Sequence, residues 1–138
     1  MKKVADKLIL MIGNKLLLDT NIVIELFRGN QIVVAMLDKQ EKVYLPTAAL
    51  GELYLGAYRS VNVPKKLQQI KSILENCIVL YTDAITADKY AIIKTALLKK
   101  GKPIPENDIW IAATAMHYKI PLYTFDEHFK EVEEIVLA

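Results

Sequence analysis

The sequence lacks several features that assign proteins to common classes. Its 138 residues include one cysteine, Cys77, which can form no internal disulfide, so we expect a reducing, cytoplasmic setting. No stretch approaches the ~18 apolar residues of a membrane-spanning helix. Five glycines and five prolines are too few for a repetitive or linker-rich chain. Because 53% of the residues are hydrophobic, the chain has the content for one folded domain.

Histidine and arginine are also scarce. The two histidines, His117 and His128, are too few with one cysteine for a zinc or copper cluster, and we expect both to be surface or packing residues. The net charge is only +2. Two arginines, Arg28 and Arg59, limit bidentate reading of nucleic-acid bases. Function must therefore depend on where the charges lie rather than on their sum.

The first fourteen residues form an extension of uncertain role. Lys2 and Lys3 precede an apolar run from Leu8 to Ile12, but this run is shorter than the roughly 7–15 residues of a secretory core, and Gly13 follows it. We divide the chain into this extension, 1–14, and a single domain, 15–138. We expect the domain to fold without the extension.

Short apolar runs alternate with helical periodicity along 15–138. Strands are predicted at 15–18, 43–45, 78–81 and 122–124, with room for a fifth at 135–137. Helices are predicted at 22–27, 31–39, 47–59, 65–75, 84–100, 107–116 and 126–133. This order predicts βαβ units with right-handed crossovers. The expected fold class is therefore α/β, in three layers (α/β/α) around a short, mainly parallel sheet.

Acidic residues follow the predicted strands. In a parallel sheet, positions just after strands and at the starts of helices gather on the carboxyl edge. Four acids meet this condition: Asp19, Glu52, Asp108 and Asp126. Asp83 and Asp88 follow the third strand and join the geometric candidates.

Each acid taken singly has an ordinary structural explanation. Asp19, Asp108 and Asp126 stand where a carboxylate caps a helix or favours its dipole. Glu52 is harder to explain in this way, because it follows Gly51 inside an otherwise apolar helix. Clustered carboxylates repel one another unless a cation compensates them. Carboxylate ligands without histidine or thiolate predict Mg²⁺, with Mn²⁺ as the alternative.

Basic residues dominate the remainder of the chain. When the four acids are left out of the count, 18 basic and 12 acidic residues remain, which gives a net charge of +6. An acidic pocket in a basic body suits a polyanionic substrate. The lysines available for phosphate contacts, which otherwise serve as solvated helix surface, are Lys65, Lys66, Lys71, Lys94, Lys99, Lys100 and Lys102.

Four sequence segments contain the four acids. They are LLLDTNIVIE near the start, LGELYLGA around Glu52, PENDIWIAATA around Asp108 and LYTFDEHF around Asp126. Together these segments resemble the PIN-domain family, and most of all the VapC-type toxins of toxin–antitoxin pairs. The resemblance covers Lys15 to Leu137, with the segments in the family's order.

The resemblance implies a metal-dependent endoribonuclease that hydrolyses RNA to products with a five-prime phosphate. It assigns catalysis and Mg²⁺ binding to Asp19, Glu52, Asp108 and Asp126, with Asp19 and Asp108 closest to the metal. Asn21 and Thr124 match accessory positions that orient the acids or the attacking water. It further implies an antitoxin partner whose amphipathic segment occupies an apolar groove. Asp83 and Asp88 are not required by the family pattern.

A partner surface is expected on the helix at 47–59. Leu55 and Tyr58 add apolar surface beyond the face that packs on the core, which predicts a homodimer or a partner-protein interface. Two alternatives to a toxin remain at this point. One is a catalytically silent PIN-fold binding module, and the other is a housekeeping RNA-processing nuclease.

Other acid-bearing folds fit less well. A phosphorelay receiver needs a lysine directly after its last strand, and a haloacid-dehalogenase-type phosphatase needs Asp-x-Asp where this chain has Asp19-Thr20-Asn21. Neither a P-loop nor a GxGxxG motif occurs.

Overall fold

The computed structural model describes residues 14–138. Its sheet has four strands, β1 (Lys15–Leu18), β2 (Lys42–Pro46), β3 (Ile78–Leu80) and β4 (Leu122–Tyr123), in the order β3-β2-β1-β4. Every pairing is parallel, with Leu17 opposite Tyr44 on one side and Leu122 on the other. All four strands therefore end at one edge of the sheet.

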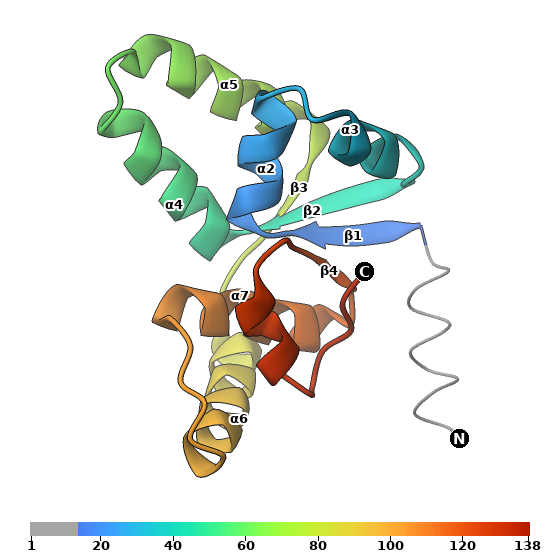
Figure 1. Cartoon of the computed structure of the whole chain (residues 1–138), viewed down its shortest axis with the longest axis vertical. Helices are drawn as coiled ribbons and strands as arrows, with labels where there is room; N and C mark the ends of the chain where they lie inside the picture. Colours follow the sequence, from blue (N-terminus) through green and yellow to red (C-terminus); the bar gives the residue numbers. More distant parts are fainter. Residues whose placement is uncertain (1–13) are drawn as a thin grey trace.

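Helices cover both faces of this sheet (Figure 1). One side carries the helices that follow β1 and β2, and the other carries those that follow β3 and β4. The first group is α2 (Thr20–Phe27), α3 (Gln31–Asp38), α4 (Thr47–Tyr58) and α5 (Val63–Asn76); the second is α6 (Ala84–Lys99), α7 (Glu106–Tyr118) and the 3-10 helix η1 (Glu127–Glu131). The expected three-layer α/β/α class is confirmed.

Short polar side chains begin several of these helices. Asp19 accepts a hydrogen bond from the backbone N–H of Thr20 at the start of α2, and Asn30 accepts from Ile32 and Val33 at the start of α3. Gly29 and Gly101 follow α2 and α6 with φ of 77° and 66°, a left-handed conformation that glycine adopts without steric cost.

The core lies along the sheet and the inner faces of the helices. Leu17, Leu18 and Leu45 are fully buried in the two central strands, with Ile22 behind them on α2. Phe129 is also fully buried and anchors η1 to the domain. Burying such side chains is the main favourable contribution to folding, so the strand end that Asp19 follows belongs to a fully buried part of the molecule.

Two local expectations at the C-terminal end were wrong. The helix expected at 126–133 is the shorter η1, and the fifth strand at 135–137 is a single parallel bridge between Leu122 and Leu137. For the strand, the reason is the length of β4, which has only two residues to offer a further strand. It offers Leu122 alone for the two hydrogen bonds, with Val136 and Ala138.

The extension assigned to 1–14 falls almost wholly outside the described residues. Asn14 is described, and its carbonyl accepts hydrogen bonds from the N–H groups of Glu41 and Lys42, each at 3.0 Å. Between residues 14 and 138, no helix has both the length and the apolar character needed to cross a membrane.

Candidate metal centre

Asp19 is held at the junction of β1 and α2. Its Oδ1 accepts from the backbone N–H of Thr20 at 2.8 Å, and its Oδ2 accepts from the hydroxyl of Thr124 at 2.7 Å. Only 4% of the residue is exposed. The bond to Thr124 crosses from β1 to the turn after β4, so it ties two strand ends together and fixes the carboxylate.

The turn after β4 is built from the same contacts. The hydroxyl of Thr124 accepts from the N–H of Asp126 at 2.9 Å, and Asn21 Oδ1 accepts from the N–H of Phe125 at 3.3 Å. Asp126 in turn accepts from the N–H of His128 and so begins η1. Asn21 and Thr124 therefore position the backbone that carries Asp126.

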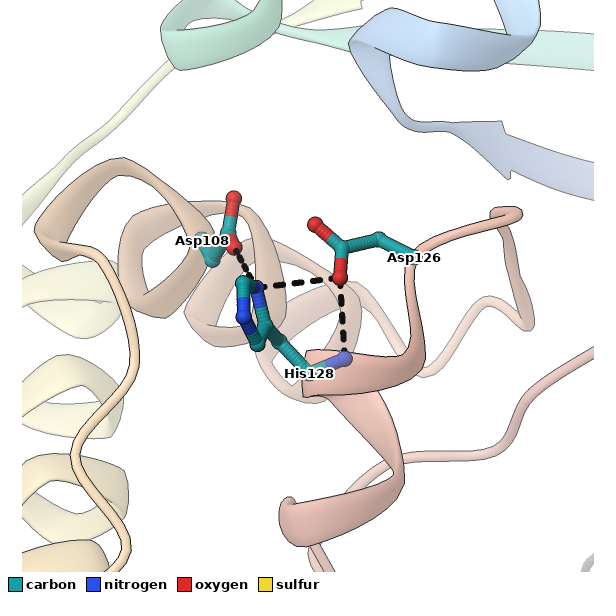
Figure 2. Close-up of side chains that lie close together, drawn as sticks. All are labelled: Asp108, Asp126 and His128. Atoms are coloured by element: carbon teal, nitrogen blue, oxygen red, sulfur yellow. Dashed lines mark hydrogen bonds and ion pairs between the residues drawn. The ribbon is translucent and has the colours of Figure 1, made fainter.

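Asp108, Asp126 and His128 converge from two different elements (Figure 2). Asp108 lies in the first turn of α7, and the imidazole of His128 lies between the two carboxylates, with Nδ1 3.4 Å from Asp108 Oδ2 and 3.0 Å from Asp126 Oδ1. Within the described chain, these three offer metal-ligating atoms that all lie within 4.8 Å of one another.

Glu52 approaches the same edge from α4. Its Oε1 is buried and accepts no hydrogen bond, and the hydroxyl of Thr20 close to it is also buried without a partner. A buried acceptor without a donor costs free energy in the apo protein. The side chains of Asn107 and Thr20 lie near the Glu52 carboxylate and lower its pKa, but they leave Oε1 without a hydrogen bond, so this oxygen is available to a further group.

The acids of the centre raise one another's pKa. Burial, followed by the charges of Asp126, Asp19 and Glu52, raises the pKa of Asp108 to about 6, although His128 opposes this rise. Burial and the charge of Asp19 raise the pKa of Glu52. Burial, and to a smaller extent Asp126, raises the pKa of Asp19 against the bonds from Thr124 and Thr20. The centre thus carries more negative charge than the described residues compensate.

The structure places all four expected acids at one edge of the sheet, with Asn21 and Thr124 beside them. His128 is exposed, as expected of a surface residue, but its ring also contacts both Asp108 and Asp126, which was not expected from the sequence. The signal that could have found it is local. A residue two positions after a capping aspartate gives its N–H to that carboxylate, which keeps its own side chain near the cap.

Other candidates have structural roles elsewhere. Asp83 caps α6 through a reciprocal pair of bonds with Thr86, and Asp88 forms an ion pair with Lys89. His117 contacts Thr86 at 3.0 Å, as a packing residue would. Burial raises the pKa of the Cys77 thiol to about 11, so this sulfur stays protonated and is a poor nucleophile.

Comparison with known proteins agrees with this arrangement. The sequence pattern of the PIN domain family matches residues 16–135, which include β1 from its second residue, all of β4 and all four acids. The chain belongs to the PIN domain family. This PIN domain is 30% identical over 123 residues to ribonuclease VapC1 of Haemophilus influenzae (strain R2866), covering 86% of this chain and 90% of that protein.

Two further similarities concern toxins and their complexes. The PIN domain is 34% identical over 121 residues to toxin FitB of Neisseria gonorrhoeae, covering 80% of this chain and 87% of that protein. It also superposes on a chain of the 2.2 Å resolution structure of VapBC-1 from nontypeable Haemophilus influenzae with a TM-score of 0.83 at 26% identity, covering 90% of this chain and 96% of that one.

The raised pKa of Asp108 predicts how the free energy of unfolding of the metal-free PIN domain changes with pH. An acid whose pKa is 3.8 unfolded and about 6 folded makes the folded state lose stability as pH rises between these values. The Asp108→Asn variant has no carboxyl group at this position, so its folded state does not lose this stability as the pH rises. In chelator, its unfolding midpoint in denaturant should equal that of wild type at pH 4 and exceed it at pH 7 and above.

Asp88→Asn is the matched control, because Asp88 is an exposed aspartate on α6. It should follow the wild-type pH profile. A midpoint for Asp108→Asn below that of wild type at pH 7 would show that the Asp108 charge stabilises the apo fold, contrary to this account.

Proposed function

We propose that this PIN domain is a metal-dependent endoribonuclease that hydrolyses RNA phosphodiester bonds. The observation that carries the proposal is the meeting of Asp19, Glu52, Asp108 and Asp126 at one sheet edge, where burial and mutual repulsion raise the pKa of three of them. Membership of the PIN family and the similarity to ribonuclease VapC1 support it. The basic remainder of the chain fits a polyanionic substrate.

The donor set fits Mg²⁺, with Mn²⁺ as a substitute. Carboxylate oxygens are ligands that hard divalent cations prefer, and a cation would satisfy the buried Oε1 of Glu52. We assign the ion to Asp19 and Asp108, with Glu52 and Asp126 completing its surroundings. When bound, such an ion neutralises charge on the phosphodiester and lowers the pKa of a water molecule.

The residues of this chain have separate tasks in the proposed reaction. Thr124 and the N–H of Thr20 hold Asp19 in one orientation, and Asn21 holds the turn that carries Asp126. Such preorganisation means that the acids need not rearrange during the reaction.

Glu52 is the proton acceptor that the geometry favours. Burial and the charge of Asp19 raise its pKa, although the side chains of Asn107 and Thr20 oppose this rise, and a raised pKa makes Glu52 a better base near neutral pH. As Glu52 takes the proton of the attacking water, the water oxygen bonds to phosphorus and the bond to the 3′-oxygen breaks. That oxygen takes a proton from solvent, and the second product keeps the five-prime phosphate.

We further propose that the chain is the toxin of a type II toxin–antitoxin pair and acts in the cytoplasm. Its similarity to toxin FitB supports this role over that of a housekeeping nuclease. The antitoxin would be a second protein that blocks the acid centre. Leu55 and Tyr58, which are 58% and 64% exposed on α4, offer apolar surface for a homodimer or for this partner.

Asp19→Asn should abolish RNA cleavage. It removes one of the charges that attract the cation, while the amide still fits the space: its single oxygen can accept from the N–H of Thr20, and its NH2 group can donate to the hydroxyl of Thr124. Glu52→Gln should lower cleavage strongly, and Asp88→Asn should leave it unchanged. The activity of each variant is measured as the initial rate of cleavage of single-stranded RNA in magnesium buffer. The midpoint of unfolding in denaturant shows whether the variant is folded.

Full activity of Asp19→Asn at limiting magnesium would reject the acid assignment. A wild-type chain that binds magnesium but cleaves no RNA would instead indicate a catalytically silent PIN module.

Replacing Leu55 and Tyr58 together by Glu should dissociate a homodimer or weaken the complex with the antitoxin, because two charges would be buried at the contact. Light scattering gives the mass of each protein, and RNA cleavage should persist. Val61→Glu is the control, since Val61 is fully exposed in the loop after α4. A wild-type monomer, together with a double variant that binds the antitoxin unchanged, would reject this surface.

A further inference from the structure

A slot with a volume of about 330 Å³ lies between α2, α4 and α5, and we call it the α4–α5 slot. Its walls include Phe27, Leu53 and Ile70, and Glu52 of the acid centre lines it as well. This volume is within the range of small-ligand sites, about 300–1,000 Å³. The slot is therefore an apolar cavity that adjoins the proposed catalytic edge.

The polar atoms of the slot indicate what it would bind. Gln69 Oε1 is buried and accepts no hydrogen bond, which leaves an acceptor that requires an N–H donor. Arg28, Lys65 and Lys66 also line the slot and are exposed, so they offer positive charge at its mouth. An apolar wall, a buried acceptor and cations at the rim together fit a planar base attached to a phosphate.

We propose that the α4–α5 slot receives one unpaired RNA base beside the scissile phosphate, and that Gln69 selects bases with an amino group. The proposal rests on the ribonuclease function above. Proteins that read single-stranded RNA stack bases on aromatic side chains and hydrogen-bond their edges, which are the roles of Phe27 and Gln69 here. Lys65 and Lys66 contact the adjoining phosphates.

The position of Glu52 determines which nucleotide is read. Glu52 and Leu53 are neighbours on α4, so one end of the slot lies at the proton acceptor. A base in the slot therefore belongs to a nucleotide next to the cleaved bond. Gln69 would act as a specificity residue, since it contacts a base and not the reacting phosphorus.

The test compares cytidine and uridine 5′-monophosphate, which are similar in size but carry an amino group and a carbonyl, respectively, at ring position 4. The exocyclic donor proposed for Gln69 is therefore present in cytidine and absent in uridine, whose base has its N–H donor at ring position 3 instead. Neither has a phosphodiester bond, so an endonuclease does not consume them. Titration calorimetry in magnesium buffer should show cytidine monophosphate binding about fivefold or more tightly, the value of one buried hydrogen bond.

Gln69→Met keeps the length of the side chain but removes its acceptor, and it should bind the two nucleotides equally. Gln68→Met is the matched control, because Gln68 is the exposed neighbour on α5, and it should keep the wild-type preference. Gly56→Leu fills the slot and should bind neither nucleotide. A Cβ at Gly56 meets no atom within 4 Å, so the first atom of the new side chain has room, and the unfolding midpoint checks that the variant is folded.

Three outcomes separate the two proposals. If the chain cleaves RNA but Gln69→Met and Gly56→Leu bind both nucleotides as wild type does, the slot proposal is wrong and the ribonuclease proposal stands. If these variants lose only the binding of a partner protein, the slot holds a peptide and the base proposal is equally wrong. If wild type cleaves no RNA, the ribonuclease proposal fails whatever the titrations show.

Discussion

Repulsion among carboxylates at the carboxyl edge of the sheet is the constraint on which this structure depends. Asp108 has a pKa of about 6 because burial and three neighbouring acids oppose its ionisation. The polypeptide holds these charges together through neutral donors, above all the Thr124 hydroxyl and the Thr20 N–H that fix Asp19. The stability of the leucine-rich strands offsets this cost, so that the edge can attract a cation.

Most of the fold could be predicted because local and global signals agree. Leu16 to Leu18 form a buried strand directly before a capping aspartate, and both features indicate the same strand-to-helix turn. The prediction failed near Leu137, where an apolar run is indistinguishable from a strand until its partner is known. β4 has two residues, and the sequence contains nothing that sets this length.

The four acids could be placed on one edge because the parallel-sheet rule needs only the order of the elements. His128 could not be placed in this way, since its approach to Asp108 depends on how tightly η1 turns after Asp126. Gln69 was also missed, because α5 shows an ordinary amphipathic pattern, and only the packing of α5 on α4 buries its Oε1. A residue whose burial depends on how two helices pack cannot be identified from the sequence pattern of either helix alone.

The clustered acids are proposed to bind a divalent cation that compensates their negative charge. A bound cation favours the ionised acids, so the number of protons released on metal binding tests this proposal most directly. Calorimetry with Mn²⁺ in two buffers of different ionisation enthalpy gives both the affinity and the number of protons released. At pH 6, Asp108 with a pKa of about 6 should by itself contribute roughly half a proton per ion, to which the raised pKa values of Asp19 and Glu52 add, and the contribution of Asp108 should be almost nil at pH 8. The absence of saturable binding, or a proton count that does not change between these pH values, would contradict the account.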